Sequence, residues 1–472
     1  MIQTLSFIVT LLGASMIFPA MADFVTGNPD SIVFASSALF VIFFGGLMFF
    51  ATRQETVAFS RRDIFLFVPA VWLLSCIATA MPFYLSSLEI SFADAFFEAA
   101  SGLTTTGSTI LTNLENMPPG ILLWRSMSQW IGGLGIVVIS ISLLPYMKSG
   151  GQQLFSLESS DKSDKPFAQT RKYTAAIFMV YVALTTGCAT VYMVLGMTPF
   201  EAINHAMTTV STGGFSTSDY SMGAFATRPM LIASSVFMLI GGLPFIYLIR
   251  FISGHHVRDV QVSWYLVITL AATVTVFVFS LHHGGEFDLD FLISCLFHVV
   301  SIITTTGYAA EDYLLWGPTA TVVFFFLTFI GGCAGSTAGG FKQFRLVIIG
   351  EVIVDTLAKT FRPNQVRSIR YGPRVVEDRL LMSVMVFSFL YAGTFIVFAA
   401  IYGVLGVDFE TATSASATAL ANVGPGIGTV VGPAGNFKEL SDAVKWMLSW
   451  EMIVGRLEIM SVYVLLLPGF WR

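Results

Sequence analysis

Ten long apolar windows, separated by short polar segments, constrain this chain more than any other feature of its sequence. They lie near residues 3–22, 32–51, 64–85, 121–147, 173–196, 230–253, 261–281, 316–350, 380–405 and 443–467. A bilayer span takes about 20 apolar residues, so each window can cross a membrane as a helix. Only 11% of the residues are charged, which excludes an ordinary soluble enzyme of this length. We predict an all-α polytopic membrane protein with ten transmembrane helices in a lipid bilayer.

The basic residues predict the orientation of the chain. They gather after the second, fourth, sixth and eighth windows, at residues 53–62, 148–172, 250–258 and 359–379. The positive-inside rule makes these segments cytoplasmic, so the intervening segments face the outside. Acidic residues outnumber basic ones there, and the basic ones are Arg125, Arg228, Lys438 and Lys445. We therefore expect an acidic mouth that collects cations, while the net charge of −5 indicates no nucleic-acid partner.

Four of the outside segments share one pattern, which indicates an internal repeat. Each has a semi-polar run too short to span the membrane, followed by a turn rich in Ser, Thr and Gly. The turns are Thr104–Gly107, Ser211–Gly214, Thr304–Gly307 and Ala421–Gly424. We divide the chain into a leading two-helix segment and four helix, pore-loop, helix repeats. The boundaries are 1–62 for the leading segment and 63–172, 173–258, 259–378 and 379–472 for the repeats.

The backbone carbonyls of these turns are candidate ion ligands. Rings of carbonyl oxygens can replace the hydration shell of an ion, and four loops around one axis supply four oxygens per layer. The glycine that ends each turn permits the backbone conformation that points carbonyls inward. The short helix before it aims its negative dipole end at the ion path. The alternative of ordinary outside loops does not explain why a short apolar helix precedes the turn four times.

Two further features lie inside predicted spans. The stretch 331–340 has five glycines in ten residues at the middle of the eighth window. Each helix-interior glycine costs about 1 kcal/mol relative to alanine, so we expect a broken helix with a mobile loop that can gate a pore. Arg456 lies in the middle of the tenth window, where an arginine is costly and usually functional. We expect it to bond carbonyls of this loop or to occlude the pore.

Other polar features fit structural roles. The glycine pairs Gly132-Gly133 and Gly241-Gly242 fit two interpretations, close packing between helices and a direct functional role. We expect His205 and His298 to pack or cap in the short pore helices, and His255, His256, His282 and His283 to be interfacial. The spacing of the four cysteines is not that of metal ligands, so we predict buried thiols at Cys76, Cys188, Cys295 and Cys333. The first window has a cleavage-like Ala20-Met21-Ala22 but no basic leader, so we expect it to be retained.

No catalytic constellation is found in the sequence. It has no HExxH motif, no nucleophile with a base at a suitable spacing, and no GK[ST] in its glycine-rich stretch. We therefore predict that the protein is not an enzyme and that it needs no organic cofactor.

Several motifs in combination resemble those of the Trk/Ktr/HKT potassium-transporter superfamily. They are TTTGST at 104–109, STGGFS at 211–216, TTTGY at 304–308, NVGPG at 422–426, GGCAGSTAGGFK at 331–342 and VGRLE at 454–458. The leading helix pair is similar to that of the bacterial TrkH/TrkG type. The resemblance implies uptake of K+ through a pseudo-fourfold pore in the bacterial inner membrane, with the pore loops outside. It also implies a homodimer and a cytoplasmic TrkA-like ring that binds nucleotides and regulates opening.

The resemblance assigns roles to individual residues. The filter carbonyls would come from Thr105, Thr106, Gly107, Thr212, Gly213, Gly214, Thr305, Thr306, Gly307, Asn422, Val423 and Gly424. The gating loop would be 331–341, with Gly331, Gly332, Gly335, Ser336, Thr337, Gly339 and Gly340, next to Lys342 and Arg456. Only one glycine recurs in all four turns, which leaves the preference for K+ over Na+ open.

An alternative function is that of a sodium- or proton-coupled secondary transporter of cations. Such transporters bind their substrate at broken helices near the middle of the membrane, between inverted repeats. Here the repeat runs in the same orientation four times, and only the eighth window is obviously broken. These two features favour the pore.

Overall fold

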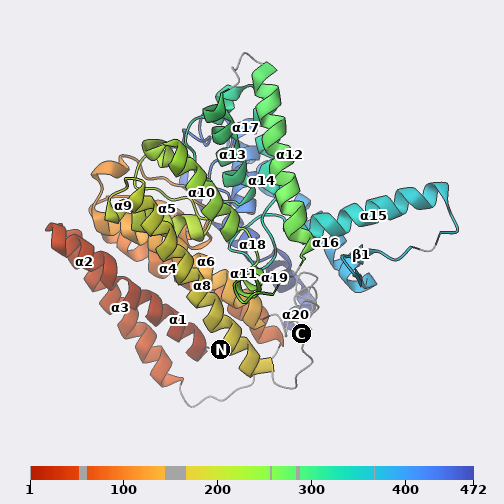
Figure 1. The fold of residues 1–472 in the computed structure, drawn as a ribbon. Coiled ribbons are helices and arrows are strands. Elements are labelled where there is room, and N and C mark those ends of the chain that lie inside the picture. The colour runs from red at the N-terminus through yellow and green to blue at the C-terminus, as the bar shows by residue number, and fades with distance from the viewer. Residues whose placement is uncertain (1, 53–60, 144–165, 256–257, 283–287, 366) are drawn as a thin grey trace.

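The computed structural model describes residues 2–52, 61–143, 166–255, 258–282, 288–365 and 367–472, and these residues are mostly helical (Figure 1). The strands within these ranges are β1 (Arg370–Tyr371) and β2 (Arg374–Val375), which pair antiparallel in a short hairpin. The all-α prediction is therefore confirmed. The basic residues from Lys148 to Lys165 lie outside the described ranges, as do His256 and His283.

The leading segment packs beside the first repeat. Its helices are α1 (Ile2–Ser15), α2 (Ile17–Thr26) and α3 (Asp30–Ala51), of which α1 and α2 together form the first span. Two carboxylates attach this segment to the first repeat. Asp23 accepts a hydrogen bond from the Gly120 N–H at 2.6 Å, and Asp30 accepts from the N–H and hydroxyl of Ser87. Hydrogen bonds to charged groups are stronger than neutral ones, so these contacts hold the segment in place.

Each of the four repeats has a first helix, a short pore helix and a second helix. The first helices are α4 (Arg61–Leu85), α8 (Pro166–Val194), α12 (Val260–His282) and α16 (Asp378–Val404). The pore helices are α5 (Phe92–Leu103), α9 (Pro199–Val210), α13 (Leu289–Ile303) and α17 (Phe409–Ala421). In the first three repeats a short 3-10 helix follows the pore loop: η1 (Leu114–Asn116), η2 (Ser221–Phe225) and η3 (Tyr313–Trp316).

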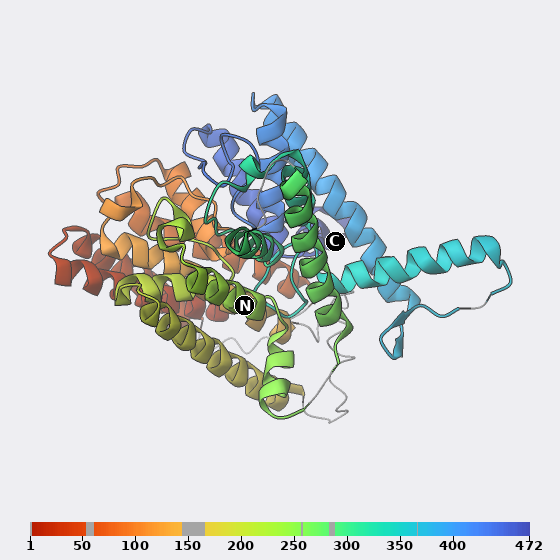
Figure 2. The same cartoon turned by 45° about the horizontal axis from the view of Figure 1, so that its top comes forward.

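The second helices differ between repeats. They are α6 (Pro119–Leu143); α10 (Arg228–Gly241) with α11 (Phe245–Ile252); α14 (Pro318–Phe329) with α15 (Gln343–Phe361); and α18 (Asp442–Arg456) with α19 (Met460–Tyr463), η4 (Val464–Leu466) and α20 (Pro468–Trp471). The helix α15 and the β hairpin extend away from the helical bundle (Figure 2). The expectation that only the eighth window is obviously broken is therefore wrong, because the sixth and tenth windows are interrupted too.

Local backbone chemistry explains these two additional breaks. The axes of α10 and α11 meet at 103°, and Pro244, which lacks an N–H, lies at the junction after Gly241-Gly242. The helix α18 ends at Arg456, where Glu458 and Ile459 have positive φ angles. Among the described residues, six helices are long and apolar enough to span a membrane, or seven with the bent pair. The count of ten spans therefore stays a prediction.

Side-chain caps fix the starts of three pore helices. Ser91 and Thr198 form capping boxes with Asp94 and Glu201, and Asp408 accepts from the N–H three residues on. Each of the three caps lies sixteen residues before the glycine of its turn. In these three repeats the pore helix therefore starts at the same distance from its turn, whereas α13 of the third repeat starts earlier and has no side-chain cap among the described residues.

Candidate functional site

The four turns after the pore helices share one backbone conformation. Thr105, Thr212, Thr305 and Asn422 have φ angles of 52° to 57°, and Gly107, Gly214, Gly307 and Gly424 have φ angles of 78° to 112°. The residues between them, Thr106, Gly213, Thr306 and Val423, have no positive φ, so the sign of φ alternates in the same order along each turn. Threonine rarely adopts a positive φ, yet it does so at the same position in three repeats. This conformation is therefore a property of the repeat.

The N–H groups of the turns point back to the pore helices. The residue before each turn glycine donates to the carbonyl five residues earlier: Thr106 to Ser101, Gly213 to Thr208, Thr306 to Ser301 and Val423 to Thr418, at 2.8–3.1 Å. Of the expected filter carbonyls, those of Gly213 and Gly424 accept hydrogen bonds, from Gln129 and Ser108. The remaining carbonyls have no hydrogen-bond donor among the described residues, so their oxygens are available to a cation.

The four turns approach one another in a closed ring. A Cβ atom built on each turn glycine shows how close the next turn lies. On Gly107 it would lie 2.2 Å from the carbonyl oxygen of Gly213, and on Gly214 it would lie 1.9 Å from that of Thr306. On Gly307 it would lie 1.9 Å from the carbonyl oxygen of Val423, and on Gly424 it would lie 2.8 Å from that of Thr106. Each turn glycine thus faces the carbonyl just before the glycine of the next repeat, and the fourth faces the first. This closure is the pseudo-fourfold arrangement that the repeats predicted. Only glycine fits at such a close approach.

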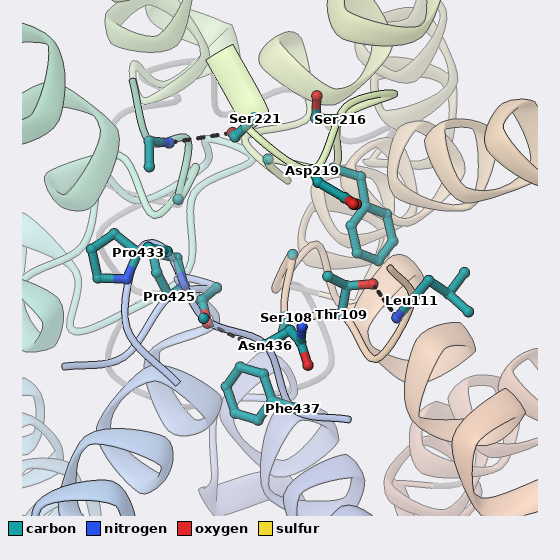
Figure 3. A pocket seen from close by; sticks show the side chains of 18 of the residues that line it. Ser108, Thr109, Leu111, Ser216, Asp219, Ser221, Pro425, Pro433, Asn436 and Phe437 are labelled. Carbon is teal, nitrogen blue, oxygen red and sulfur yellow. Dashed lines mark hydrogen bonds between the residues drawn. The ribbon is translucent and has the colours of Figure 1, made fainter. Parts of the chain in front are cut away.

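A cavity of about 270 Å³ opens at the glycine side of the ring. All four turn glycines line it, together with side chains that include Ser108, Thr109 and Asn436 (Figure 3). Among the described residues of its lining, Asp219 is the one acidic side chain, and its carboxylate accepts the N–H groups of Asn113 and Leu114. The lining therefore combines the turns with neutral polar and apolar side chains, and Arg125 is its basic residue as Asp219 is its acidic one.

Two basic residues that we counted on the outside are buried in ion pairs. Arg125 lies 2.7 Å from Glu98, and Lys445 lies 2.6 Å from Asp94. Each pair takes one basic and one acidic residue of these segments into the protein, so the excess of acidic residues there is unchanged. A count of charges along the sequence cannot separate such residues from surface ones.

The segment 330–342 lies on the other side of the ring and separates α14 from α15. The Gly339 N–H donates to the Thr305 hydroxyl at 2.6 Å, and the Thr337 hydroxyl donates to the Val210 carbonyl at 3.1 Å. The Cys333 N–H donates to the carbonyl of Gly242, at the break between α10 and α11. The predicted break of the eighth window is therefore present, and its loop lies directly against the turns of the second and third repeats.

Cationic side chains contact this loop. Arg456 is almost fully buried, and its Nη2 donates to the Thr337 carbonyl at 2.9 Å, which is the hydrogen bond that the sequence led us to expect. Lys342 donates from Nζ to the Ala338 carbonyl. The predicted gating residues are thus brought together: Gly331, Gly332, Gly335, Ser336, Thr337, Gly339 and Gly340 lie in the loop, and Lys342 and Arg456 lie beside it.

The glycine pairs of the second helices pack against the pore loops. A Cβ atom on Gly132 would lie 1.8 Å from the Leu103 carbonyl oxygen, and one on Gly133 would lie 2.8 Å from the Ser211 side chain. A Cβ atom on Gly241 would lie 3.0 Å from the Thr212 side chain. The pairs therefore serve close packing, and they place the second helices directly behind the turns.

Sequence reasoning missed Gln129, a fully buried residue of α6. Its Nε2 donates to the Gly213 carbonyl at 2.5 Å, and its Oε1 accepts from the Phe215 N–H at 3.0 Å. One side chain thus holds two backbone groups of the second turn. The sequence could have indicated this role, because Gln129 has a polar amide side chain within the apolar window 121–147 and a buried polar group needs hydrogen-bond partners.

His205 and His298 are hydrogen-bonded within their pore helices, and the cysteines are buried. His205 and His298 each place Nδ1 at 2.8 Å from the carbonyl four residues earlier in the pore helix. All four cysteine side chains are buried. Among the described residues, no group of three or more His, Cys, Asp or Glu side chains could hold a metal ion.

The fold and the ring define a class of protein, the multi-pass membrane proteins built from four pore-loop repeats around one axis. The chain belongs to the TrkH family of cation transport proteins, whose family model matches residues 30–282 and 264–468. It is therefore a membrane transport protein and not an enzyme.

Known relatives match over nearly the whole chain. The Trk system potassium uptake protein TrkI of Halomonas elongata is 40% identical over 100% of this chain and 96% of that protein. TrkH of Vibrio parahaemolyticus is 34% identical over 100% of this chain and 99% of that protein. The crystal structure of the potassium transporter TrkH from Vibrio parahaemolyticus superposes with a TM-score of 0.92, at 32% identity, over 100% of this chain and 99% of the other.

Proposed function

We propose that this protein takes up K+ across the membrane through a central pore, with the carbonyls of the four turns as its selectivity filter. Its relatives are named potassium uptake proteins. The observation that carries the proposal is the closed ring, in which the turn glycine of every repeat meets a carbonyl of the next. Such a ring provides layers of oxygens that replace the hydration shell of K+.

The loop 331–341 is the gate in this proposal, and Arg456 holds it shut. Loop and arginine are joined by the hydrogen bond to Thr337, and the loop also bonds the hydroxyl of Thr305 in the third turn. A cation that leaves the filter would meet this buried segment and its positive charges. Opening therefore requires the loop to give up these hydrogen bonds together.

The proposal extends to the surroundings of the pore. The protein acts in the bacterial inner membrane as a homodimer, with the pore loops facing outside. A cytoplasmic TrkA-like ring binds nucleotides and regulates the loop. K+ is the transported ion, and this chain carries no organic cofactor. The basic residues on alternate segments support the orientation.

Uptake into cells tests the proposal first. A bacterial host without its own K+ uptake is complemented with this chain, with and without the nucleotide-binding partner, and uptake of K+, Rb+ and Na+ is measured. We expect growth at low K+ and faster uptake of K+ than of Na+. No rescue under either condition would contradict the proposed function.

Two glycine substitutions test whether the turns form a selectivity filter or are surface loops. Gly307→Ala places a methyl group 1.9 Å from the Val423 carbonyl oxygen, whereas Gly406→Ala meets no atom within 4 Å. Both positions have a positive φ, so the backbone strain is matched. We expect Gly307→Ala to lose K+ selectivity or flux and Gly406→Ala to keep both.

Purified protein in liposomes tests the coupled alternative. With only a K+ gradient imposed, the proposed pore conducts K+ down that gradient. A flux that requires a Na+ or proton gradient would instead establish a coupled secondary transporter.

A further inference from the structure

Glu98, His205 and His298 occupy one equivalent position in the first three repeats, nine residues before the turn glycine. All three are fully buried in their pore helices. In the fourth repeat Ala415 takes this position, and its neighbour Ser414 donates to the Ile427 carbonyl at 2.8 Å. A buried polar side chain at one position of three repeats indicates a shared task.

The shared task is to hold the chain just beyond the turn. The contacts are Glu98 with the Thr109 hydroxyl and the Ile110 N–H, His205 with the Ser216 hydroxyl, and His298 with the Ala310 N–H, at 2.9–3.1 Å. In each case a side chain before the turn bonds the segment after it. Both ends of each turn are therefore attached to the same pore helix.

Arg125 connects the Glu98 contacts of the first repeat to the segment around Ser216, which His205 holds in the second repeat. This buried residue of α6 uses three nitrogens: Nε bonds Glu98 at 2.7 Å, Nη1 donates to the Ser216 carbonyl at 2.9 Å, and Nη2 donates to the Thr109 hydroxyl at 3.1 Å. Its guanidinium lies 4.2 Å from the centre of the Phe215 ring. The planar fork of arginine suits such a junction, and lysine could not reach all three acceptors.

The connection continues into the third repeat. The Tyr308 hydroxyl donates to the His205 carbonyl at 3.1 Å, and the Ser301 hydroxyl donates to the Tyr308 carbonyl at 2.7 Å. Tyr308 directly follows the turn glycine Gly307. We call this chain of buried residues the cuff; its members are Glu98, Arg125, Ser216, His205, Tyr308 and Ser301.

The position of the cuff suggests what it does. A buried ion pair such as Glu98–Arg125 need not add net stability, because desolvation of both charges opposes their attraction. Its geometry does fix where the segments after the first and second turns lie relative to each other. Discrimination between K+ and Na+ depends on how closely the carbonyl layers keep their spacing, or on how many carbonyls reach the ion.

We propose that the cuff, with Arg125 as its central positioning residue, holds the filter at the width that excludes Na+. This inference rests on the proposed K+ filter, and it identifies what holds the turns in place on the side of the cavity. Loss of Arg125 would relax the spacing between the first two turns without removing any filter carbonyl. The consequence is a pore that still conducts K+ and also admits Na+.

The test measures the ratio of Na+ to K+ flux in liposomes. Arg125→Gln is compared with Arg228→Gln, which breaks the exposed ion pair to Asp290 outside the cuff. We expect the ratio to rise by about tenfold in Arg125→Gln, as for the loss of one charge-assisted hydrogen bond, and to stay at the parent value in Arg228→Gln. A parent-like ratio in correctly assembled Arg125→Gln overturns the inference.

Two further variants test the cuff without a lone buried charge. Tyr308→Phe removes one hydroxyl, and Glu98→Gln with Arg125→Gln removes both charges together. Either variant should raise the ratio even if Arg125→Gln alone does not assemble, and parent-like ratios in both overturn the inference. If the parent shows no K+ selectivity, or Gly307→Ala leaves it unchanged, the proposed filter itself has failed instead.

Discussion

The side-chain amide of Asn422 donates a hydrogen bond to the Thr106 hydroxyl at 3.0 Å, and so joins the turn of the last repeat to that of the first. The same nitrogen donates to the Met452 carbonyl in α18 at 2.9 Å. Asn422 has a φ of 57°, a conformation that asparagine tolerates better than most residues. This residue therefore meets a backbone requirement and closes the ring between repeats that are far apart in sequence.

Replacement of this amide tests the closure of the ring. Asn422→Asp keeps the size and shape of the side chain but places an acceptor oxygen where the amide nitrogen now donates to the Thr106 hydroxyl and to the carbonyls of Met452 and Ala419. We expect a loss of about 1–3 kcal/mol in unfolding free energy, with slower K+ uptake. Asn116→Asp, on the exposed η1 helix, is the control and should behave like the parent in both assays. Parent-like melting and uptake in Asn422→Asp would contradict this role.

The ring also predicts a graded glycine series. Alanine is strained at both Gly307 and Gly424, because both have a positive φ, of 80° and 112°. The added Cβ lies 1.9 Å from a carbonyl oxygen at Gly307 but 2.8 Å from one at Gly424. We expect K+ uptake to fall further in Gly307→Ala than in Gly424→Ala. The reverse order, measured at equal amounts of membrane-inserted protein, would count against the observed ring geometry.

Arg456→Gln is expected to open the proposed gate more often. The variant loses a charge-assisted hydrogen bond to the Thr337 carbonyl, worth about 1.5–3 kcal/mol, which corresponds to a roughly 10–100-fold change in an equilibrium. K+ flux in liposomes without the regulatory partner should rise accordingly. Lys359→Gln, which removes a half-exposed charge from α15, is the control. Unchanged flux in Arg456→Gln would remove the gate from the proposal.

The segments that follow the first and second turns should respond to acid through Glu115. The Ser218 hydroxyl donates to its carboxylate, and this hydrogen bond, with that of the Asp219 N–H, lowers the pKa of Glu115 from the ordinary value of a glutamate. A lowered pKa in the folded state means that the contact stabilises the protein above the unfolded pKa and is lost as pH falls through the folded value. We expect melting temperature to fall below about pH 4.5 in the parent. In Glu115→Gln that part of the pH dependence should disappear, and an identical pH profile would contradict the assignment.

Much of the architecture could be predicted because it depends on local sequence. The length of each apolar window, the semi-polar pore segments and the turn glycines depend on residues that are close together in the chain. The glycine-rich stretch likewise predicted a broken helix, because glycine disfavours the helix wherever the stretch lies. The break after Gly242 was missed although Gly241, Gly242 and Pro244 mark it in the sequence. The break after Arg456 depends on the positive φ angles of Glu458 and Ile459, which the local sequence does not predict.

The sequence by itself determined that the chain spans a membrane, repeats one unit four times and ends each pore segment at a glycine. Only the tertiary structure decided which groups meet: that Gly424 faces Thr106, that Arg125 is buried between two repeats, and that Arg456 bonds Thr337. The physical reason is that hydrophobic periodicity and turn chemistry act over a few residues. The partners of a buried polar group are set by helices that pack together from distant parts of the chain.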